Sequence, residues 1–308
     1  MSNRTGFSMV ELLIAVALAL LLSTGIISAA LHGTNLSRQL RLGNEVLEAG
    51  RYLVSTIDGQ ISLAGFYGPL DLTMQEQLPK PDICTADGAV MQYPVDGLNN
   101  VAQNYRLCGG EALLANTDSL LIRRAEISAM LPGSPLISEQ HYIQVQGNQY
   151  IRAIGADAGA FSLRQRDGTT ASPIRVWTQS LYYVSGDHVL KRRRYIKGRY
   201  SNPEPLAEGV DDLQIFYGID RSGDGVANGH GGRAAFVSAP QNANEWQNIV
   251  AIKYYLLLSS NENGLAMADQ ASYNYADKTD VTFNDHKQRK LFYGFSRLRN
   301  SVSVRGDE

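Results

Sequence analysis

The sequence lacks the motifs that usually carry enzyme chemistry. Its five histidines are scattered, with no His-Glu-x-x-His pair and no Cys/His spacing typical of zinc sites. Neither a Gly-x-Ser-x-Gly elbow nor a Gly-x-x-x-x-Gly-Lys-Ser/Thr loop occurs. Gly223, Gly225 and Gly229 miss the dinucleotide-binding spacing by one residue. We therefore expect no catalytic residues, no organic cofactor and no enzymatic activity.

The chain also lacks an excess of either charge. Across 308 residues, 28 Lys and Arg against 30 Asp and Glu give a net charge of -2, so nothing global favours nucleic acid as the main ligand. Cys and Trp are scarce, with two of each. By contrast, 16 Tyr and 29 Gly indicate many strands and turns rather than a helical bundle.

One long apolar run lies near the N-terminus. Residues 1–6 are polar and carry one positive side chain, Arg4, whereas no polar side chain occurs from Leu12 to Leu22. About 20 such residues in a helix span a hydrocarbon core of about 30 Å. The positive-inside rule then places residues 1–6 in the cytoplasm and everything after residue 31 outside it. A plain signal anchor is the simplest alternative for such a run.

The helical pattern continues beyond the apolar run without a break, so a cleaved secretory signal fits poorly. We predict one rod of roughly 80 Å from Phe7 to Ile61, with an amphipathic second half. Its apolar stripe is expected at steps of four and three, at Leu36, Leu40, Gly43, Leu47, Gly50, Val54, Ile57 and Ile61.

Glu11 is unusual because it lies inside the apolar stretch, near its cytoplasmic end. A carboxylate at that depth is costly and indicates a functional partner. The nearest cation would be a free amine at Phe7, produced by cleavage after Gly6. The alternative is a glutamate that reaches to the membrane interface.

The segment from Gly6 to Ile14, Gly-Phe-Ser-Met-Val-Glu-Leu-Leu-Ile, resembles the prepilin processing motif of type IV pilins and type II secretion pseudopilins. The resemblance implies that a prepilin peptidase cleaves between Gly6 and Phe7 and methylates the Phe7 amine. It also implies that Glu11 registers subunits in the growing fibre. The sequence departs from many major pilins in having no proline between Phe7 and Phe66.

The remaining chain is punctuated by Gly and Pro and reads as strands. Nine runs are predicted as strands: 119–124, 141–146, 149–154, 160–165, 174–183, 189–196, 210–217, 248–258 and 291–299. Ser185-Gly186-Asp187 is predicted as a hairpin turn, and residues 261–285 as a long surface loop. The fold class is therefore α+β, a long helix packed on a largely antiparallel sheet, as in pilins.

The predicted organisation has four parts. Residues 1–6 form a leader peptide, 7–31 the transmembrane half of the helix, 32–62 its amphipathic half, and 63–308 a periplasmic or extracellular β-rich domain. Because this domain lies outside the cytoplasm, we expect Cys84 and Cys108 to form a disulfide within a loop-rich segment.

Landmarks along the domain narrow the resemblance to the PilW-type minor pilins. They are Leu63-Ala-Gly-Phe-Tyr-Gly68, Leu181-Tyr-Tyr-Val184, Leu190-Lys-Arg-Arg-Arg194, Pro205-Leu-Ala-Glu-Gly-Val-Asp-Asp-Leu-Gln214, Tyr217-Gly-Ile-Asp220 and Leu298-Arg-Asn300. The resemblance implies a low-abundance structural subunit that primes pilus assembly and sits at or near the tip. Its expected partners are other minor pilins, the major pilin, the prepilin peptidase and the inner-membrane assembly platform.

Two further clusters invite a binding role. Asp220, Ser222, Asp224 and Asn228 have the spacing with which a calcium loop begins, but Gly231 replaces the glutamate expected at the twelfth position. A metal-free Gly/Asp loop is the alternative. Residues 191–199 hold six basic side chains, for which a solvated edge strand is favoured over contact with partner pilins, and over contact with DNA.

The sequence thus predicts a bacterial inner-membrane protein with one span and its N-terminus inside, which later enters a fibre at the periplasm or cell surface. The closest alternative is a type II secretion minor pseudopilin of the J-like kind. A tip adhesin or DNA-binding module is an alternative from another class, and a membrane-anchored periplasmic enzyme is a third.

Overall fold

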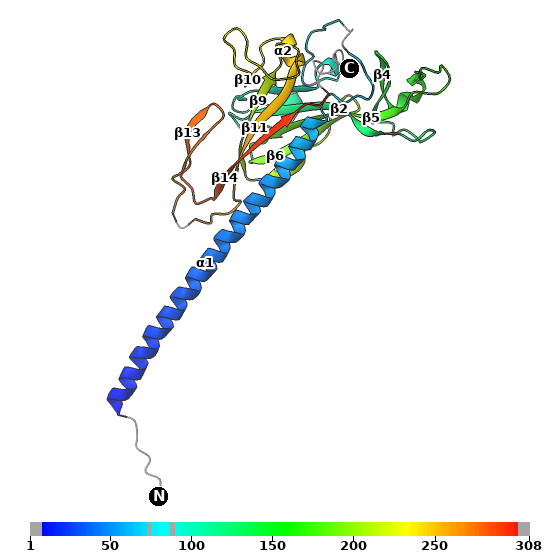
Figure 1. Cartoon of the computed structure of the whole chain (residues 1–308). Coiled ribbons are helices and arrows are strands. Elements are labelled where there is room, and N and C mark those ends of the chain that lie inside the picture. Colours follow the sequence, from blue (N-terminus) through cyan, green and yellow to red (C-terminus); the bar gives the residue numbers. More distant parts are fainter. Residues whose placement is uncertain (1–7, 73–75, 87–89, 266, 301–308) are drawn as a thin grey trace.

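The computed structural model describes residues 8–72, 76–86, 90–265 and 267–300. A single long helix, α1 (Met9–Ser62), projects from a β-rich domain, and its first half lies far from that domain (Figure 1). The sequence of α1 contains no proline, so no residue of that kind interrupts its backbone hydrogen bonds or kinks it. The predicted cleavage residues Gly6 and Phe7 lie outside the described residues.

In the described residues, the domain contains two larger antiparallel sheets and a separate hairpin. In the eight-stranded sheet the order is β1-β2-β5-β3-β4, and β6 pairs with β5, β7 and β8. Its strands are β1 (Val95–Leu98), β2 (Ser119–Ala129), β3 (His141–Gln146), β4 (Gln149–Ile154), β5 (Ile174–Val184), β6 (Val189–Ile196), β7 (Arg199–Tyr200) and β8 (Glu204–Glu208).

The four-stranded sheet has the order β10-β9-β11-β14 and lies beside α1 (Figure 1). Its strands are β9 (Val210–Ile219), β10 (Phe236–Val237), β11 (Ile249–Ser259) and β14 (Arg289–Arg297), and the hairpin consists of β12 (Ser272–Tyr275) and β13 (Lys278–Thr282). Short helical elements complete the fold: α2 (Ala243–Gln247), η1 (Val90–Gln92), η2 (Leu107–Gly109) and η3 (Gly155–Ala160).

Eight of the nine predicted strands are present, and the turn at residues 185–187 does join β5 to β6. The strand predicted at 160–165 is wrong. That segment is largely exposed and makes only an isolated bridge, Arg164 to Ala171, because no neighbouring strand lies there to complete a ladder. Residues 261–285 are not a plain loop, since they contain the β12–β13 hairpin. The sequence analysis did not predict β8. Its segment is polar and lacks an alternation of apolar side chains, and it forms a strand because it pairs with β6.

The buried stripe of α1 differs in part from the predicted one. Gly50, Ile57 and Ile61 are buried as expected, but Leu36 and Leu40 are 57% and 61% exposed. The domain reaches α1 only from about Arg38 onward, where Arg38 pairs with Glu262 at 2.9 Å and the Gln39 carbonyl accepts a hydrogen bond from Gln288 at 3.1 Å. Over the covered half, the other buried positions are Leu42, Val46 and Leu53.

Two hydrophobic clusters organise the domain. In the first, the buried stripe of α1 packs against inward-facing side chains of both larger sheets, among them Ile122, Tyr182 and Ile252. The second gathers around Trp177 and is covered by the loop-rich segment that follows α1, including Tyr67 and Met91. The helix is therefore fixed to both sheets by direct packing.

Asp118 fastens the two sheets together. Its backbone N–H donates to the Leu213 carbonyl at 2.8 Å, and its carboxylate accepts from the backbone N–H groups of Asn100 at 2.8 Å and Ile215 at 2.7 Å. The side chain is almost completely buried. Burial, which outweighs these hydrogen bonds, raises the pKa of the Asp118 carboxyl to about 7.

We predict opposite effects for two glycine substitutions in α1. A Cβ at Gly50 would lie 2.1 Å from Cζ of Phe292, whereas a Cβ at Gly59 would meet nothing within 4 Å. Gly50→Ala should therefore lower the free energy of unfolding by about 1–2 kcal/mol, because overpacking outweighs helix propensity. Gly59→Ala should raise it by up to about 1 kcal/mol. Urea unfolding of the full chain in detergent, followed by tryptophan fluorescence, measures both; equal stabilisation would contradict the packing.

We also predict a pH-dependent effect of Asp118→Asn. The side-chain amide leaves one of two backbone N–H groups facing a donor, which should cost about 1–3 kcal/mol near pH 4. Because folding raises the pKa of Asp118, the stability that this carboxyl contributes is complete below its ordinary value of 3.8 and is lost as pH rises through about 7. The difference in unfolding free energy between wild type and variant should therefore shrink from about pH 4 to about pH 8. A difference that grows with pH would show that Asp118 is ionised in the folded protein.

Candidate functional site

The first half of α1 makes no packing contact with the domain. Its large apolar side chains are exposed, as Leu13, Leu22 and Ile26 illustrate at 68%, 69% and 70%. Among the described residues, α1 is the one helix long and apolar enough to cross a membrane, and none of its apolar window is buried. A signal sequence would have the same properties, so the distinction depends on the residues around its start.

At that start, Glu11 belongs to a capping box. The Ser8 backbone N–H donates to Oε2 of Glu11 at 2.9 Å, while Ser8 Oγ accepts from the Val10 N–H at 3.3 Å. A carboxylate in the first helical turn also interacts favourably with the positive end of the helix dipole. The Ser-x-x-Glu spacing could have predicted this cap from sequence. The expected partner, an amine on Phe7, lies outside the described residues and stays a prediction.

The second half of α1 is attached to the four-stranded sheet by a partly buried polar contact. The Asp58 carboxylate accepts hydrogen bonds from the Tyr254 hydroxyl at 2.8 Å and from the Ser296 hydroxyl. Burial, together with the neighbouring Asp58 carboxylate, raises the pKa of the Tyr254 hydroxyl, so that it stays a donor. The Tyr254 hydroxyl also donates to the Val54 carbonyl at 3.1 Å. These bonds fix both the rotation and the depth of α1 on the sheet.

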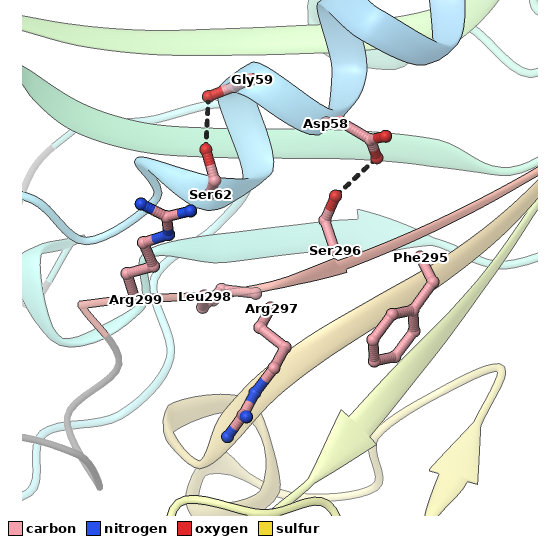
Figure 2. Close-up of a pocket in the computed structure, with 8 residues that line it drawn as sticks. All are labelled: Asp58, Gly59, Ser62, Phe295, Ser296, Arg297, Leu298 and Arg299. Carbon is pink, nitrogen blue, oxygen red and sulfur yellow. Dashed lines mark hydrogen bonds between the residues drawn. The ribbon is translucent and has the colours of Figure 1, made fainter.

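Two grooves lie along α1. The first, of about 710 Å³, lies between the end of the helix (Asp58, Gly59 and Ser62) and residues 295–299 at the end of β14 (Figure 2). The second, of about 450 Å³, lies between α1 and β8, with Glu45, Glu48 and Glu208 around it. At 100° per residue, the helical residues of the two grooves lie on either side of the buried stripe.

Cys84 and Cys108 form the predicted disulfide, with their Cα atoms 5.1 Å apart. Both cysteines pack against the second hydrophobic cluster. The bond therefore closes the loop-rich segment over the face of the eight-stranded sheet that is turned away from α1.

The predicted calcium loop forms a closed hydrogen-bonded turn. One oxygen of Asp220 accepts from the Ser222 and Gly223 N–H groups, at 3.0 and 2.7 Å, and the other accepts from Gly225 at 2.7 Å. Asp224 accepts from the Val226 N–H at 2.9 Å, and the Asn228 amide donates to the Ser222 hydroxyl. No group of three or more His, Cys, Asp or Glu side chains arranged for a metal occurs in the described part of the chain. Calcium binding by this loop stays an untested prediction.

The basic segment was predicted as a solvated edge strand, and this prediction is wrong. Strand β6 is an interior strand, with β5 on one side and β7 and β8 on the other. Two of its charges have partners outside the strand: Lys191 pairs with Glu111 at 2.8 Å, and Arg192 with Glu204 at 2.8 Å. Arg193 is buried and donates to the Ser201 carbonyl. Arg193 shares its buried face with Tyr195, because alternate residues of a strand point to the same side.

The predicted site residues thus lie in four separate places. Glu11 is at the start of α1, the disulfide lies over the eight-stranded sheet, the Asp220 loop follows β9, and the basic residues are inside a sheet. Sequence reasoning missed Asp58, Tyr254 and Ser296, because the three residues come together only through tertiary contacts.

Comparisons with known proteins agree with the helix and its motif. Residues 1–27 match the model of the prokaryotic N-terminal methylation motif, and residues 181–300 match that of Type IV Pilus-assembly protein W. The chain is also similar to a solved type IV-like pilin, TTHA1219 from Thermus thermophilus, at 12% identity and a TM-score of 0.38, covering 84% of this chain and 96% of that one. Because this TM-score is low, the fold is assigned from the structure described above and not from this similarity. No curated protein matches the chain.

A long helix whose start matches the methylation motif, packed on antiparallel sheets, agrees with the architecture expected of a type IV pilin-like protein. The match over residues 181–300, together with that motif, supports its assignment to the PilW-type minor pilins. The same motif and the exposed apolar helix indicate a membrane anchor and a place within the pilus assembly machinery.

We predict that reduction of the disulfide lowers the free energy of unfolding by about 2–4 kcal/mol. The bond joins residues 24 apart, and opening such a loop restores chain entropy to the unfolded state. The Cys84→Ser, Cys108→Ser double variant should behave like the reduced wild type. Urea unfolding with and without dithiothreitol measures the effect, and a double variant as stable as the oxidised protein would contradict it.

Proposed function

We propose that this protein is a non-catalytic minor pilin, which after cleavage and N-methylation helps to start a type IV pilus and lies at or near its tip. The observation that carries the proposal is the unburied apolar half of α1, which begins directly after the Gly6-Phe7 pair. A soluble domain would have to bury such a helix. A prepilin keeps it for a membrane first and for a fibre later.

The physical basis is an exchange of one apolar environment for another. In the membrane, the side chains of residues 9–31 contact lipid; in a fibre, they contact the apolar helices of neighbouring subunits. Burial is therefore retained during transfer, and close packing between helices supplies specificity. Glu11 is the exception, because its charge needs a partner in both environments.

The proposed partners are other minor pilins and the major pilin through α1, the prepilin peptidase, and the inner-membrane assembly platform. Before assembly the protein spans the inner membrane once, with the N-terminus inside, as the single Arg4 ahead of the span favours. The tip position and the priming role are supported by the resemblance to PilW-type minor pilins.

A minor pseudopilin of a type II secretion system is the closest alternative, since it would share the helix and its processing. Deletion distinguishes the two, because loss of twitching indicates a pilus and loss of secretion indicates the other system. A DNA receptor built on Arg192, Arg193 and Arg194 has less support, since Arg192 and Arg193 have partners within the domain. The Asp220 loop provides no independent support for an adhesin.

We predict that the mature protein starts with N-methylated Phe7 and needs Glu11 for assembly. Intact-mass and peptide mass spectrometry of the protein from its own cells should show loss of residues 1–6 and one added methyl group. Glu11→Ala should reduce incorporation into sheared fibres at least tenfold, because the Phe7 amine then lacks its counter-charge. Quantitative immunoblotting of fibre and membrane fractions measures this.

Ser8→Ala is the matched control. It removes the hydroxyl of the capping box but keeps the Glu11 carboxylate, so incorporation should stay close to that of the wild type. Equal incorporation of Glu11→Ala would remove the role assigned to the carboxylate. A Gly6→Val protein that keeps its leader and still functions fully would contradict the pilin proposal itself.

A further inference from the structure

We propose that the free edge of β14 binds an extended, acidic segment of a neighbouring pilin-like subunit, which adds as a fifth strand to the four-stranded sheet. The nature of the partner rests on the proposed function. The site itself rests on the geometry of β14.

The hydrogen bonds at both ends of β14 define which of its residues face outward. The Leu298 N–H donates to the Val250 carbonyl, and the Ser260 N–H donates to the Gln288 carbonyl. Both pairs continue the register in which β11 and β14 are aligned. In an antiparallel pair, alternate residues bond to the same neighbour, so the even-numbered residues of β14 bond to β11. The N–H and C=O groups of Leu291, Tyr293, Phe295 and Arg297 therefore point away from the sheet. Within the described residues, no strand pairs with them.

At the opposite edge of the same sheet, formed by β9 and β10, outward hydrogen-bonding groups of β9 are paired. On β9, the outward Leu213 carbonyl and Ile215 N–H are both bonded by Asp118, and the strand β10 pairs with Tyr217 and Gly218. One edge is thus closed by a buried side chain and an added strand, while the other presents a row of free groups about 20 Å long. Edge strands in monomeric proteins are normally shielded, so an open one indicates a place for another chain.

The side chains along the open edge are suited to a protein partner. Tyr293 and Phe295 are 51% and 47% exposed on the outer face. They continue into a set of rings on that face, with Tyr255 5.3 Å from Tyr293 and Phe236 6.3 Å from Phe295. Side chains of an added strand would lie on these rings. Interfaces are enriched in such aromatic anchors.

Charge makes the expected segment acidic. From Arg289 to Asn300 the chain has four basic residues and no carboxylate. Arg289 is buried in ion pairs, but Lys290, Arg297 and Arg299 are exposed. In the groove of Figure 2, Arg299 lies beside the end of α1, and Arg297 lies on the other side of the strand with Phe295. The carboxylate of Asp58, the acidic residue of this groove, already accepts two hydrogen bonds and is directed into the junction.

Continuity with α1 favours a neighbouring subunit over other partners. The groove beyond β14 has the end of α1 as its wall. In a fibre, neighbouring subunits pack along this helix, so a neighbouring domain lies beside the same wall. The added strand would extend the helix contact onto the domain, and its backbone bonds would supply affinity without requiring a particular sequence.

Two variants of Phe295 test the backbone contact. Phe295→Pro removes an outward N–H that β11 does not use, so the sheet should remain intact. Phe295→Thr removes the same ring but keeps the N–H. In cells, tagged full-length protein should recover its companion pilins at least tenfold less with Phe295→Pro, and within about threefold of wild type with Phe295→Thr. Equal recovery with Phe295→Pro would overturn the proposal. Arg299→Glu should also weaken recovery of the companion pilins. If the complex is fully retained with this variant, the bound segment is not acidic.

Hydrogen exchange on the full-length wild type tests the site even if Phe295→Pro does not fold. In detergent, the amides of Tyr293, Phe295 and Arg297 should exchange fast, and each purified companion pilin is then added in turn. At least tenfold slowing by one of them supports the proposal. Slowing by none overturns it.

Two other results would assign the edge to a different occupant. If the amides exchange slowly in the isolated subunit, and this protection is lost in a chain that ends at Asn300, residues 301–308 occupy the edge. Slowing that grows with concentration of the chain alone would assign it to a second copy. Either result overturns the choice of partner.

The failure of this inference is distinguishable from failure of the proposed function. N-methylated Phe7 and exclusion of Glu11→Ala from fibres, together with full recovery by Phe295→Pro, would leave the pilin function in place and remove the edge contact. If Phe7 is not processed, the proposed pilin function is wrong. If a protein other than a pilin then protects the edge of β14, the edge is a binding site but its partner is not a pilin.

Discussion

The continuity of α1 across the domain boundary is the constraint on which the other features depend. The helix has an exposed apolar half and a half buried against two sheets, with no proline between them. Whatever holds the exposed half therefore also orients the domain. The contact among Asp58, Tyr254 and Ser296 makes this orientation specific, since apolar packing alone would tolerate rotation of the helix. A rigid junction lets a membrane anchor also serve as the axis of an assembled subunit.

Much of this arrangement could be predicted from the sequence because it depends on local patterns. Apolar composition over residues 9–31 defines the exposed half, and the Gly6-Phe7 and Glu11 spacing defines the processing motif. Apolar and aromatic runs, such as that of β11, were also recognised as strands. The buried face of α1 was recovered less well. Two overlapping stripes satisfy the helical period, and only tertiary packing, which sets the rotation of the helix and the length of it that the domain covers, decides between them.

The basic strand shows why a charged segment cannot be interpreted from sequence alone. Alternation puts Arg193 on the same face as Tyr195, but it does not show that this face is buried, and it could not supply Glu111 or Glu204, which come from other parts of the chain. Arg289 is a similar case. Its side chain is 2% exposed and pairs with Asp211, and its guanidinium lowers the pKa of the Asp285 carboxyl to about 2. Such pairs hold loops in place, so a run of like charges in sequence need not become a surface of that charge.

The difference between the edges of the four-stranded sheet follows from the same reasoning. Asp118 has to be buried to reach β9, and this burial raises its pKa, so closing that edge has an energetic cost. No equivalent side chain among the described residues reaches β14, although Gly294 there lies so close to Tyr254 that a Cβ would be 1.9 Å from its ring. The inner face of β14 is therefore fitted closely to its neighbours, while its edge keeps its hydrogen-bonding groups free. A strand that is tightly packed on one side and unpaired on another is better explained by a partner in the assembled state than by loose folding.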